Sequence, residues 1–400
     1  MKILTINSGS TSIKFKLYDM PSEDILASGK VENIGIDGSK LTYSSKGFEV
    51  KDLKQDVKDH KQGLNLIISR LLDKDNGVLK DKGEIDAIGH RVVNIGDRVD
   101  SHELIDDRIL GYLKDCVELA PLHNPPNLLG IEVCLDEFGK NTANIAIFDN
   151  IFHKGMPPKA FLYGLPIEYY EKYRIRKYGF HGIAYTYMVG RACEMAGVKP
   201  ADLKIIALML GGGSSITAVS KGTSLDTSMG FTPTEGLIMS TRSGDIDPAI
   251  LPYLQKKEDI SPDGIDNMIN KRSGVLGLSK KFSSFLDIEN GLNKGDDDCK
   301  RAFDLYVYRI KKYIGAYIAA MGGVDMIVFG GGIGENSSVA REAIFKDMEI
   351  LGIRLDKEKN NDRSLDERFI STDDSEVKIA IVKVDEEVII ARESFRLVSK

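Results

Sequence analysis

Residues 204–248 read KIIALMLGGGSSITAVSKGTSLDTSMGFTPTEGLIMSTRSGDIDP. The apolar run at 205–210 predicts a buried strand, and residues 216–219 predict a second strand after a turn of three glycines and two serines. Glycines at the tip of such a hairpin let backbone N–H groups approach a phosphate closely. Downstream, Arg242 lies in a loop of Ser, Gly and Asp, which suits a guanidinium that binds an anion. Taken alone, the stretch favours a tight β-turn beside an exposed arginine, because short motifs also match by chance.

The same pattern occurs twice more in the chain. Residues 2–18 (KILTINSGSTSIKFKLY) predict a strand, a small polar turn and a second strand. Residues 326–329 predict a strand that runs into the glycine-rich loop 330–334, with a helix from about residue 338. Three strand-to-glycine loops predict one site that contacts a polyphosphate from several sides. The first two hairpins also indicate an internal duplication.

The length, charge and cysteines of the chain limit its class. A chain of 400 residues is long enough for about two domains. Its net charge of −6 argues against nucleic-acid binding through a broad basic surface, so an anion must be held by a local site. Met1 leads directly into a predicted strand and no apolar run is long enough for a bilayer, so we expect a cytoplasmic protein without a membrane partner. The four cysteines are widely spaced, so neither a zinc site nor a disulfide framework is indicated.

Periodicity predicts the remaining elements. Helical spacing of apolar residues is expected at 62–74, 105–119 and 127–138 and over much of 250–320, whereas the charge run 294–300 predicts a solvated loop. A strand at 378–384 precedes a last helix. The acids 385–387 at the start of that helix can be dipole partners or can supply a magnesium ligand.

Three further polar residues are candidates for the site, two of them at strand ends, where open α/β sheets place their sites. Arg91 follows a short strand predicted at 85–88, and Asp149 follows one at 144–148. Arg91 could equally form a surface ion pair, and Asp149 could cap a helix. His181 lies between glycines, which is ambiguous by itself.

Taken together, the motifs resemble the acetate kinase family, which includes propionate kinases. The resemblance covers essentially the full length, and the order and spacing of the motifs make chance resemblance implausible. It is carried by NSGSTSIK (7–14), GHRVV (89–93), APLHNP (120–125), FDNIFH (148–153), YGFHG (178–182), DTSMGFTP (226–233), TRSGDIDP (241–248) and GIGENS (332–337).

The resemblance implies an α/β fold of two duplicated actin-like (RNase H-like) domains around a central cleft. Residues 1–150 with 386–400 would form the N-terminal domain with its C-terminal helix. Residues 151–385 would form the second domain, which would carry the nucleotide loops and the probable dimer interface. A homodimer is implied by the resemblance alone.

The implied reaction is reversible, direct in-line transfer of a phosphoryl group from ATP to acetate, giving acetyl phosphate and ADP. A carboxylate is already anionic at neutral pH, so the task is to bring two anions together. Arg91 and Arg242 would bind the carboxylate and phosphoryl oxygens. His181 would stabilise the equatorial oxygens, and Asp149 would orient the arginines.

The resemblance also implies ligand contacts. Mg²⁺ (or Mn²⁺) would be held by Asn7 and Glu386, with Glu387 as the alternative. The acyl pocket would be lined by Arg91, Val93, Leu122, Phe180 and Pro233, whereas His123, like Lys14, would be a contact on the phosphate side. The nucleotide and its phosphates would contact Lys14, Gly211, Gly212, Gly213, Gly331, Gly332, Ile333, Gly334 and Asn336.

Departures from the family pattern gather on the nucleotide side. The family usually has His-Leu-Gly-Asn-Gly where this chain has MLGGG at 209–213, so Met209 and Gly212 replace polar residues. The usual Ser-Ser-Asp-x-Arg-Asp is FSSFLD at 282–287, with Ser284 and Leu286 in place of the acid and the arginine. The usual His-Gly-Gly is NIG at 94–96, and Gly-Thr-Ser-His is GIAY at 182–185, which ends in Tyr185.

Three interpretations stay open on the sequence. The favoured one is an ATP-dependent acetate kinase. The second is a short-chain acyl kinase that uses propionate, or a phosphoryl donor other than ATP such as pyrophosphate, because each hydrogen bond lost to a charged phosphate costs about 1.5 to 3 kcal/mol. The third is a catalytically impaired paralogue that acts as a binding protein. The apolar pocket residues favour acetate or propionate over a bulky acid.

Overall fold

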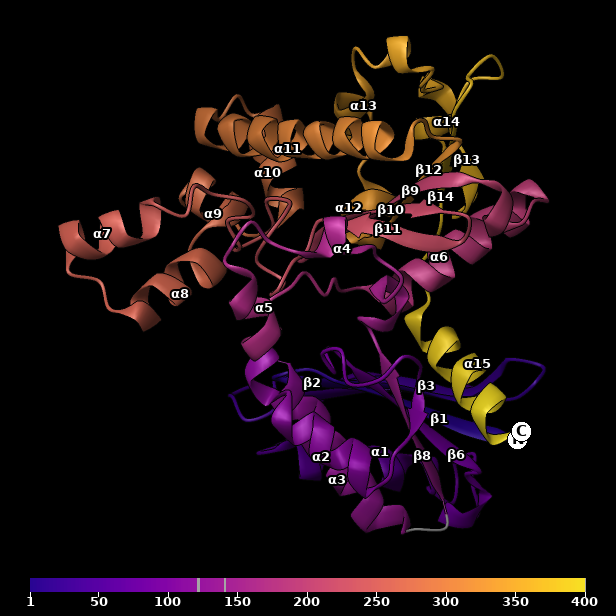
Figure 1. Cartoon of the computed structure of the whole chain (residues 1–400). Coiled ribbons are helices and arrows are strands. Elements are labelled where there is room, and N and C mark those ends of the chain that lie inside the picture. The colour runs from indigo at the N-terminus through magenta and orange to yellow at the C-terminus, as the bar shows by residue number, and fades with distance from the viewer. Residues whose placement is uncertain (121–122, 140–141, 400) are drawn as a thin grey trace. The chain divides into compact units, whose positions relative to one another are not determined.

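A computed structural model describes residues 1–120, 123–139 and 142–399 of the chain. The chain divides into two compact units, and each is described by itself here (Figure 1). Unit 1 comprises Met1–Ile151 and Asp385–Lys400, and unit 2 comprises Phe152–Val384. Within the described ranges, no helix is long and apolar enough to cross a membrane.

Unit 1 is a mixed sheet of eight strands in the order β5-β4-β3-β2-β1-β6-β8-β7. β1 pairs antiparallel with β2 and parallel with β6, which in turn pairs parallel with β8. Its elements are β1 (Lys2–Ser8), β2 (Ser12–Asp19), β3 (Asp24–Glu32), β4 (Lys40–Ser45), β5 (Phe48–Lys54), α1 (His60–Leu71), β6 (Ala87–Val92), β7 (Glu103–Leu104), α2 (Asp107–Asp115), α3 (Asn124–Phe138), β8 (Ala143–Phe148) and α15 (Glu386–Val398).

Successive side chains along a strand of unit 1 point to opposite faces of the sheet, and each face is covered by a different set of helices. Ile88 packs in one cluster with residues of α1 and α3. The next residue, Gly89, faces α15, where a Cβ would lie 2.6 Å from Ile390 Cγ2. Glycine is therefore needed at this close approach of strand and helix.

Unit 2 is a sheet of six strands in the order β11-β10-β9-β12-β14-β13. Its strands are β9 (Lys204–Leu210), β10 (Ser214–Ser220), β11 (Thr223–Thr227), β12 (Met326–Gly330), β13 (Arg368–Phe369) and β14 (Lys378–Ile381). Its helices are α4 (Pro158–Phe161), α5 (Ile167–Tyr173), α6 (Gly182–Ala196), α7 (Ile250–Glu258), α8 (Pro262–Lys271), α9 (Gly274–Ser279), α10 (Phe285–Asn293), α11 (Asp297–Met321), α12 (Gly331–Asn336), α13 (Ser338–Phe345) and α14 (Lys357–Asn361).

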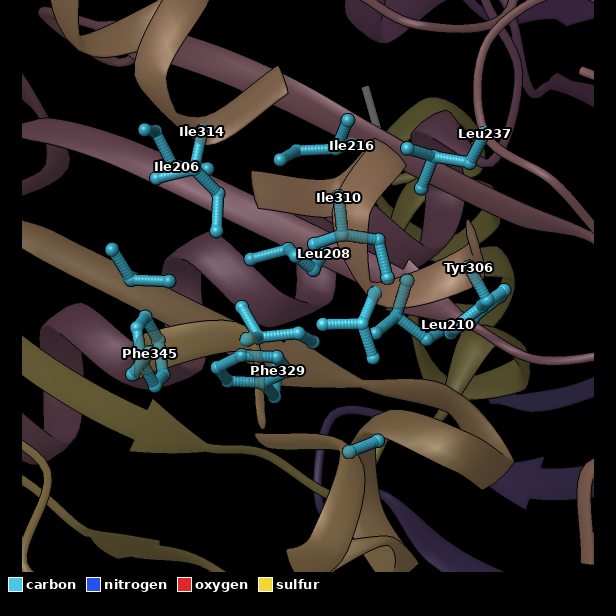
Figure 2. Packing of buried hydrophobic residues seen from close by; sticks show 14 of the residues in the cluster. Ile206, Leu208, Leu210, Ile216, Leu237, Tyr306, Ile310, Ile314, Phe329 and Phe345 are labelled. Atoms are coloured by element: carbon cyan, nitrogen blue, oxygen red, sulfur yellow. The ribbon is translucent and has the colours of Figure 1, made fainter. Parts of the chain in front are cut away.

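The core of unit 2 also has two sides. Ile206, Leu208 and Phe329 pack with α11 and α13 on one face of the sheet, as Figure 2 shows for part of this cluster. Their neighbours Ile205 and Ala207 pack with α6 on the other face. Because both faces are covered, these strands read as continuous apolar runs in the sequence.

The two sheets share one strand pattern. β9 pairs antiparallel with β10 and parallel with β12, which pairs parallel with β14. The run β3-β2-β1-β6-β8 in unit 1 thus corresponds to β11-β10-β9-β12-β14 in unit 2. The duplication inferred from the two hairpins is confirmed at the level of topology.

Several predicted boundaries were wrong for identifiable reasons. The helix expected from residue 127 begins at Asn124, because two prolines in the first turn do not interrupt a helix. The charge run 294–300 is only partly a loop, since Asp296 caps α11 by accepting from Cys299 N–H. The glycines after β12 form the short helix α12 instead of an open loop. The strand expected at 378–384 ends at Ile381, and the helix expected at 105–119 is α2 followed by a 3₁₀ turn at Val117–Leu119.

Candidate active site

Arg91 is the centre of the polar group in unit 1. It lies within β6, one residue before its end, and not after the strand as expected. Its Nε and Nη2 donate to Asp149 Oδ2 at 3.1 and 2.6 Å, and its Nη1 donates to Glu386 Oε2 at 3.2 Å. Asp149 follows β8, the parallel neighbour of β6, so the two strand ends bring the pair together. The predicted grouping of Arg91, Asp149 and Glu386 is therefore present in unit 1.

The pKa values of Arg91 and Glu386 are both raised in this group, for different reasons. Burial opposes the charge on Arg91, but Asp149 and Glu386 together raise its pKa above the usual value. Burial also raises the pKa of Glu386, and the nearby Asp149 and Glu387 act in the same direction, whereas Arg91 and Lys14 lower it. Glu387 lies 3.7 Å from Lys16, which also pairs with Asp385 at 2.7 Å. The site thus has a carboxylate excess that a cation would offset.

Asn7 and Lys14 lie opposite each other at the ends of β1 and β2 that meet at the polar turn. Lys14 is exposed and Asn7 is partly buried. Carboxylate and amide oxygens are the donors that Mg²⁺ prefers, usually through one or two protein ligands together with water and phosphate oxygens. Among the described residues, no group of three or more His, Cys, Asp or Glu side chains could hold a metal alone. Asn7 and Glu386 each carry an oxygen of the type that such a metal prefers.

Buried asparagines hold the backbone that follows Arg91. Asn127 accepts from Val93 N–H at 3.1 Å and donates to Ser8 O at 2.7 Å, which ties the end of β6 to the end of β1. Asn124 accepts from Asn94 N–H, and Asn150 donates to Gly96 O at 2.7 Å. These amides give hydrogen-bond partners to buried backbone groups that lie beyond the end of β6. None of the three asparagines was predicted from the sequence, although Asn124 and Asn150 belong to motifs quoted above.

The pocket residues are only partly accounted for. Val93 is buried in unit 1, and Phe180 is buried in unit 2. Pro233 is partly buried in unit 2. Leu122 lies outside the described residues.

His181, Gly213 and Arg242 lie close together in unit 2. A Cβ placed on Gly213 would lie 3.5 Å from Arg242 Nη1 and 3.6 Å from His181 Cε1. His181 has φ 59° and ψ 24°, the left-handed region that a non-glycine residue occupies at some cost. The glycine turn, the histidine and the arginine predicted from separate motifs are therefore neighbours.

Arg242 has no carboxylate partner among the described residues. The hydrogen bonds of its Nη1 go to Pro233 O at 3.5 Å and Met239 Sδ at 3.8 Å. Burial lowers the pKa of Arg242. A partly buried guanidinium without a counter-ion is suited to an anionic ligand.

His153 fixes the backbone directly before His181. His153 Nε2 donates to Phe180 O at 2.9 Å, so Nδ1 accepts from Ser224 O–H at 2.9 Å. Gly179 has φ +78°, and a Cβ there would lie 2.5 Å from His153 Cδ2. His153 had no predicted role beyond its place in a motif, and in the structure it positions Phe180, the residue before His181.

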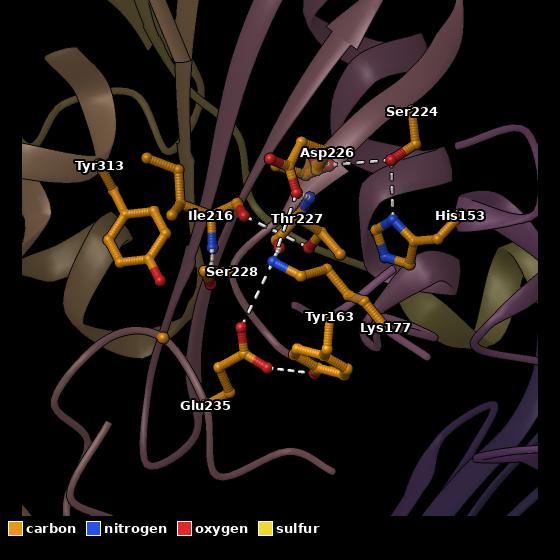
Figure 3. A network of polar contacts seen from close by, with 12 residues as sticks. His153, Tyr163, Lys177, Ile216, Ser224, Asp226, Thr227, Ser228, Glu235 and Tyr313 are labelled. Atoms are coloured by element: carbon orange, nitrogen blue, oxygen red, sulfur yellow. Dashed lines mark hydrogen bonds and ion pairs between the residues drawn. The ribbon is translucent and has the colours of Figure 1, made fainter. Parts of the chain in front are cut away.

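A polar network supports the loop that leads to Arg242 (Figure 3). Lys177 lies 3.4 Å from Asp226 and 3.5 Å from Glu235, and Tyr163 donates a hydrogen bond to Glu235. At the far end of the loop, Asp245 accepts from Gly236 N–H at 2.8 Å and from Tyr313 O–H at 2.8 Å. The two ends of the segment 226–245 are thus both tied down.

The two glycine-rich turns of unit 2 lie at one end of its sheet, because β9 and β12 are parallel and Gly330 pairs with Met209. Gly331 has φ +78°, and a Cβ there would lie 2.6 Å from Leu210 O. The buried Arg341 donates to Gly334 O at 2.8 Å and so fixes the end of α12. Burial, helped by Arg368 and Arg363, lowers the pKa of Arg341 to about 10.

The residues that depart from the family pattern on the nucleotide side differ from one another in how far they are buried. Leu286 lies on α10 and is 66% exposed, whereas Met209 is partly buried against the cluster around α6. Ser284 precedes α10 and makes no capping bond with its side chain. Leu286 is therefore an exposed apolar residue where the family usually has an arginine.

The duplicated sheets and their glycine turns are those of a phosphotransferase with the actin-like kinase fold. The Acetokinase family matches residues 2–392. The acetate kinase of Thermotoga maritima is 49% identical over 402 residues, which cover 100% of this chain and 99% of that protein. The chain belongs to the acetokinase family.

Solved structures agree with this membership. The crystal structure of Porphyromonas gingivalis acetate kinase superposes with a TM-score of 0.92 at 41% identity, and covers 99% of each chain. A propionate kinase from Francisella tularensis subsp. tularensis superposes with a TM-score of 0.91 at 35% identity, again covering 99% of each chain. The predicted fold class and family are confirmed.

Proposed function

We propose that this chain is an acetate kinase, which transfers the γ-phosphoryl group of ATP to an oxygen of acetate. The new bond joins the acetate oxygen to phosphorus, and the bond from phosphorus to the β,γ-bridging oxygen breaks, which leaves ADP. The reaction is reversible because its two sides, acetate with ATP and acetyl phosphate with ADP, are close in free energy. An acyl phosphate and ATP are both strong phosphoryl donors. The chemistry needs positioning and charge stabilisation more than acid–base catalysis.

The proposal is carried by one observation, the position of Arg242 beside the glycine turn at 211–213. Arg242 Nη1 lies beside Gly213 and His181, and it has no carboxylate partner in the described chain. Backbone N–H groups of glycines, an imidazole and a guanidinium together suit the equatorial oxygens of a phosphoryl group.

Arg91 would hold the acetate carboxylate. A guanidinium has five N–H donors, and the bonds to Asp149 and Glu386 use three of them. One N–H on each Nη remains, which is the fork that binds a carboxylate through both oxygens. The two acids thus orient the fork while leaving it available, and Val93 would contact the methyl group.

A divalent cation, Mg²⁺ or Mn²⁺, would be held by Asn7 and Glu386, where it would neutralise phosphate charge. Lys14, close enough to lower the pKa of Glu386, would add a positive charge on the same side. The glycines at 211–213 and α12 would contact the nucleotide, with Ile333 and Asn336 on the adenosine side. A cytoplasmic location, a homodimer and the domain roles assigned from the sequence are further predictions of this proposal.

The test is a hydroxylamine trap for acyl phosphate, with acetate and propionate as acceptors and ATP, GTP and pyrophosphate as donors. We expect turnover with acetate, ATP and magnesium that Arg242→Ala abolishes and Arg354→Ala, an exposed arginine of unit 2, leaves unchanged. A preference for propionate, or for a donor other than ATP, would replace acetate or ATP in the proposal. Absence of turnover with every donor in both directions would overturn it and favour a binding protein.

A further inference from the structure

His181 begins a short chain of hydrogen-bonded side chains. Its Nδ1 lies 2.8 Å from Ser215 Oγ, and the hydroxyl of Tyr185 lies 2.5 Å from the same oxygen. Helix α6 begins directly after His181, and Tyr185 lies in its first turn. Ser215 lies on β10. One serine hydroxyl therefore joins the histidine to a tyrosine.

This chain contains two of the departures from the family pattern. Tyr185 and Met209 both stand where the family usually has histidine. Met209 pairs with Ser215 across β9 and β10, and it packs against the cluster that contains Tyr185. Two changes that are 24 positions apart in the sequence therefore meet around Ser215.

The direction of the hydrogen bonds follows from burial. Tyr185 is fully buried, and burial raises its pKa, so it keeps its proton at neutral pH. Ser215 is its one side-chain hydrogen-bond partner among the described residues. No backbone carbonyl of the described residues accepts a hydrogen bond from this hydroxyl, so Ser215 Oγ is the acceptor that the structure offers.

If Ser215 donated to Tyr185, the phenol O–H would be a buried donor without an acceptor, which is costly. Tyr185 O–H therefore donates to Ser215 Oγ, and Ser215 O–H is left to donate to His181 Nδ1. An imidazole nitrogen that accepts carries no proton, so the proton of neutral His181 lies on Nε2.

The tyrosine ring cannot easily turn away from this arrangement. Its centroid lies 5.8 Å from that of Phe152 and 5.7 Å from that of His153. His153 is itself fixed by Phe180 O and Ser224. The same buried histidine thus supports both the backbone before His181 and the tyrosine that orients its ring.

We propose that Tyr185, acting through Ser215, is a positioning residue that keeps neutral His181 in the Nε2–H form and turns that donor toward the transferring phosphoryl group. The inference rests on the proposed function for its catalytic meaning. Nε2–H and the Arg242 guanidinium then act as two donors beside Gly213, and their charge and dipole stabilise the equatorial oxygens. The tautomer itself is a property of the free protein.

The test is nuclear magnetic resonance of the full chain labelled with ¹⁵N-histidine. The chain has six histidines, and His181→Gln identifies the signal of interest by its loss. Two-bond ¹H–¹⁵N correlations distinguish the Nε2–H form, the Nδ1–H form and the doubly protonated ring. We expect His181 in the Nε2–H form at neutral pH, and a shift toward a mixture of tautomers in Tyr185→Phe.

The same variant should lower kcat about tenfold with little change in the KM for acetate, since one lost hydrogen bond of about 1.4 kcal/mol corresponds to that factor. The matched control is Tyr317→Phe, which removes another buried hydroxyl of unit 2 that has no hydrogen-bond partner among the described residues. It should change neither the His181 signal nor kcat.

An Nδ1–H or doubly protonated His181 in the unchanged protein would overturn the inference, and so would a tautomer that Tyr185→Phe leaves unaltered. Ser215→Ala is the second variant, and it should alter the tautomer in the same direction as Tyr185→Phe. Failure of the proposed function gives a different result, because the unchanged protein would then make no acyl phosphate whatever tautomer its histidine adopts.

Discussion

Arg91 Nη2 lies 2.6 Å from Asp149 Oδ2, although the two residues are 58 positions apart, Arg91 near the end of β6 and Asp149 directly after β8. Asp149 is 1% exposed on its side chain and Arg91 is 17% exposed, so the pair is largely shielded from water. Because Asp149 accepts two hydrogen bonds from one guanidinium, it fixes the plane of Arg91. The N–H groups of Arg91 that are not used in the pair are then held in a fixed direction.

Asp149→Asn should therefore reduce kcat/KM for acetate about 100-fold, as expected for loss of a charge-assisted contact of about 3 kcal/mol. The amide keeps the size of the side chain but not its charge, so Arg91 loses its fixed plane. The measurement is initial-rate kinetics at varied acetate. Glu137→Gln, which breaks the Lys82 pair elsewhere in unit 1, is the control, and an Asp149→Asn variant as active as the control contradicts the assigned role.

Asp245 should control activity through the loop that carries Arg242. Asp245→Asn weakens its bonds to Gly236 N–H and Tyr313 O–H, so the loop end loses a charged acceptor. We expect kcat to fall about tenfold, a cost typical of one charge-assisted bond. Tyr313→Phe removes one of the two bonds and should have a smaller effect.

The readout for Asp245 is kcat at saturating acetate and ATP, together with far-ultraviolet circular dichroism to show that the variant is folded. If Asp245→Asn keeps full activity, the bonds of Asp245 to Gly236 and Tyr313 do not position Arg242. An effect of Tyr313→Phe larger than that of Asp245→Asn would point to a role for the tyrosine outside this bond.

Leu286→Arg should strengthen nucleotide binding. Leu286 is 66% exposed on α10, so a longer polar side chain can be accommodated without disturbing the core. If the nucleotide approaches α10 in this chain, restoring the guanidinium lowers the KM for ATP about tenfold, since a hydrogen bond to a charged group contributes about 1.5 to 3 kcal/mol.

The control for Leu286→Arg is Leu305→Arg, an exposed leucine of α11 that is 42% exposed. Both variants add the same charge to unit 2, so a change shared by both reflects charge alone. An unchanged KM for ATP in Leu286→Arg would mean that nucleotide contacts in this chain do not include α10.

The sequence was most informative where pattern and local chemistry agree. The hairpins at 2–18 and 204–220 have apolar strands on both sides of small polar turns, and the structure has β1–β2 and β9–β10 at these places. Arg91 and Asp149 were predicted as candidates because both lie at ends of apolar runs, and parallel pairing of β6 and β8 brings them together.

Contacts between side chains that are distant in the sequence were not predictable in the same way. Nothing about Ser215 or Tyr185 in the sequence shows that they share a hydrogen bond, because that depends on how α6 packs on β10. The asparagines around Val93 are a second example. They act as hydrogen-bond partners for backbone groups that are buried only once the chain has folded. The helical start at Gly331 was missed because glycines usually indicate a loop.

Protonation of His90 should make the stability of the chain depend on pH. His90 is 2% exposed and lies 2.8 Å from Asn144 Oδ1 through its Nε2. Burial lowers the pKa of His90 to about 4, although the bond to Asn144 acts in the opposite direction. In the unfolded chain the pKa returns to about 6.5.

Between these two values the unfolded chain binds a proton that the folded chain does not, so the free energy of unfolding falls as the pH falls. The slope approaches about 1.4 kcal/mol per pH unit, which gives a loss on the order of 3 kcal/mol by pH 4. His90→Gln lacks this proton. The comparison is therefore the difference in unfolding free energy between the unchanged protein and His90→Gln, measured with urea from pH 8 to pH 4.5.

The difference should stay constant between pH 7 and pH 8, where the histidine is neutral in both states, and should then shift in favour of the variant as the pH falls below about 6.5. Titrating carboxylates affect both proteins equally and cancel in the difference. A difference that does not change over the whole range would mean that His90 takes up its proton as readily in the folded chain as in the unfolded one, and that its burial in unit 1 is not maintained in solution.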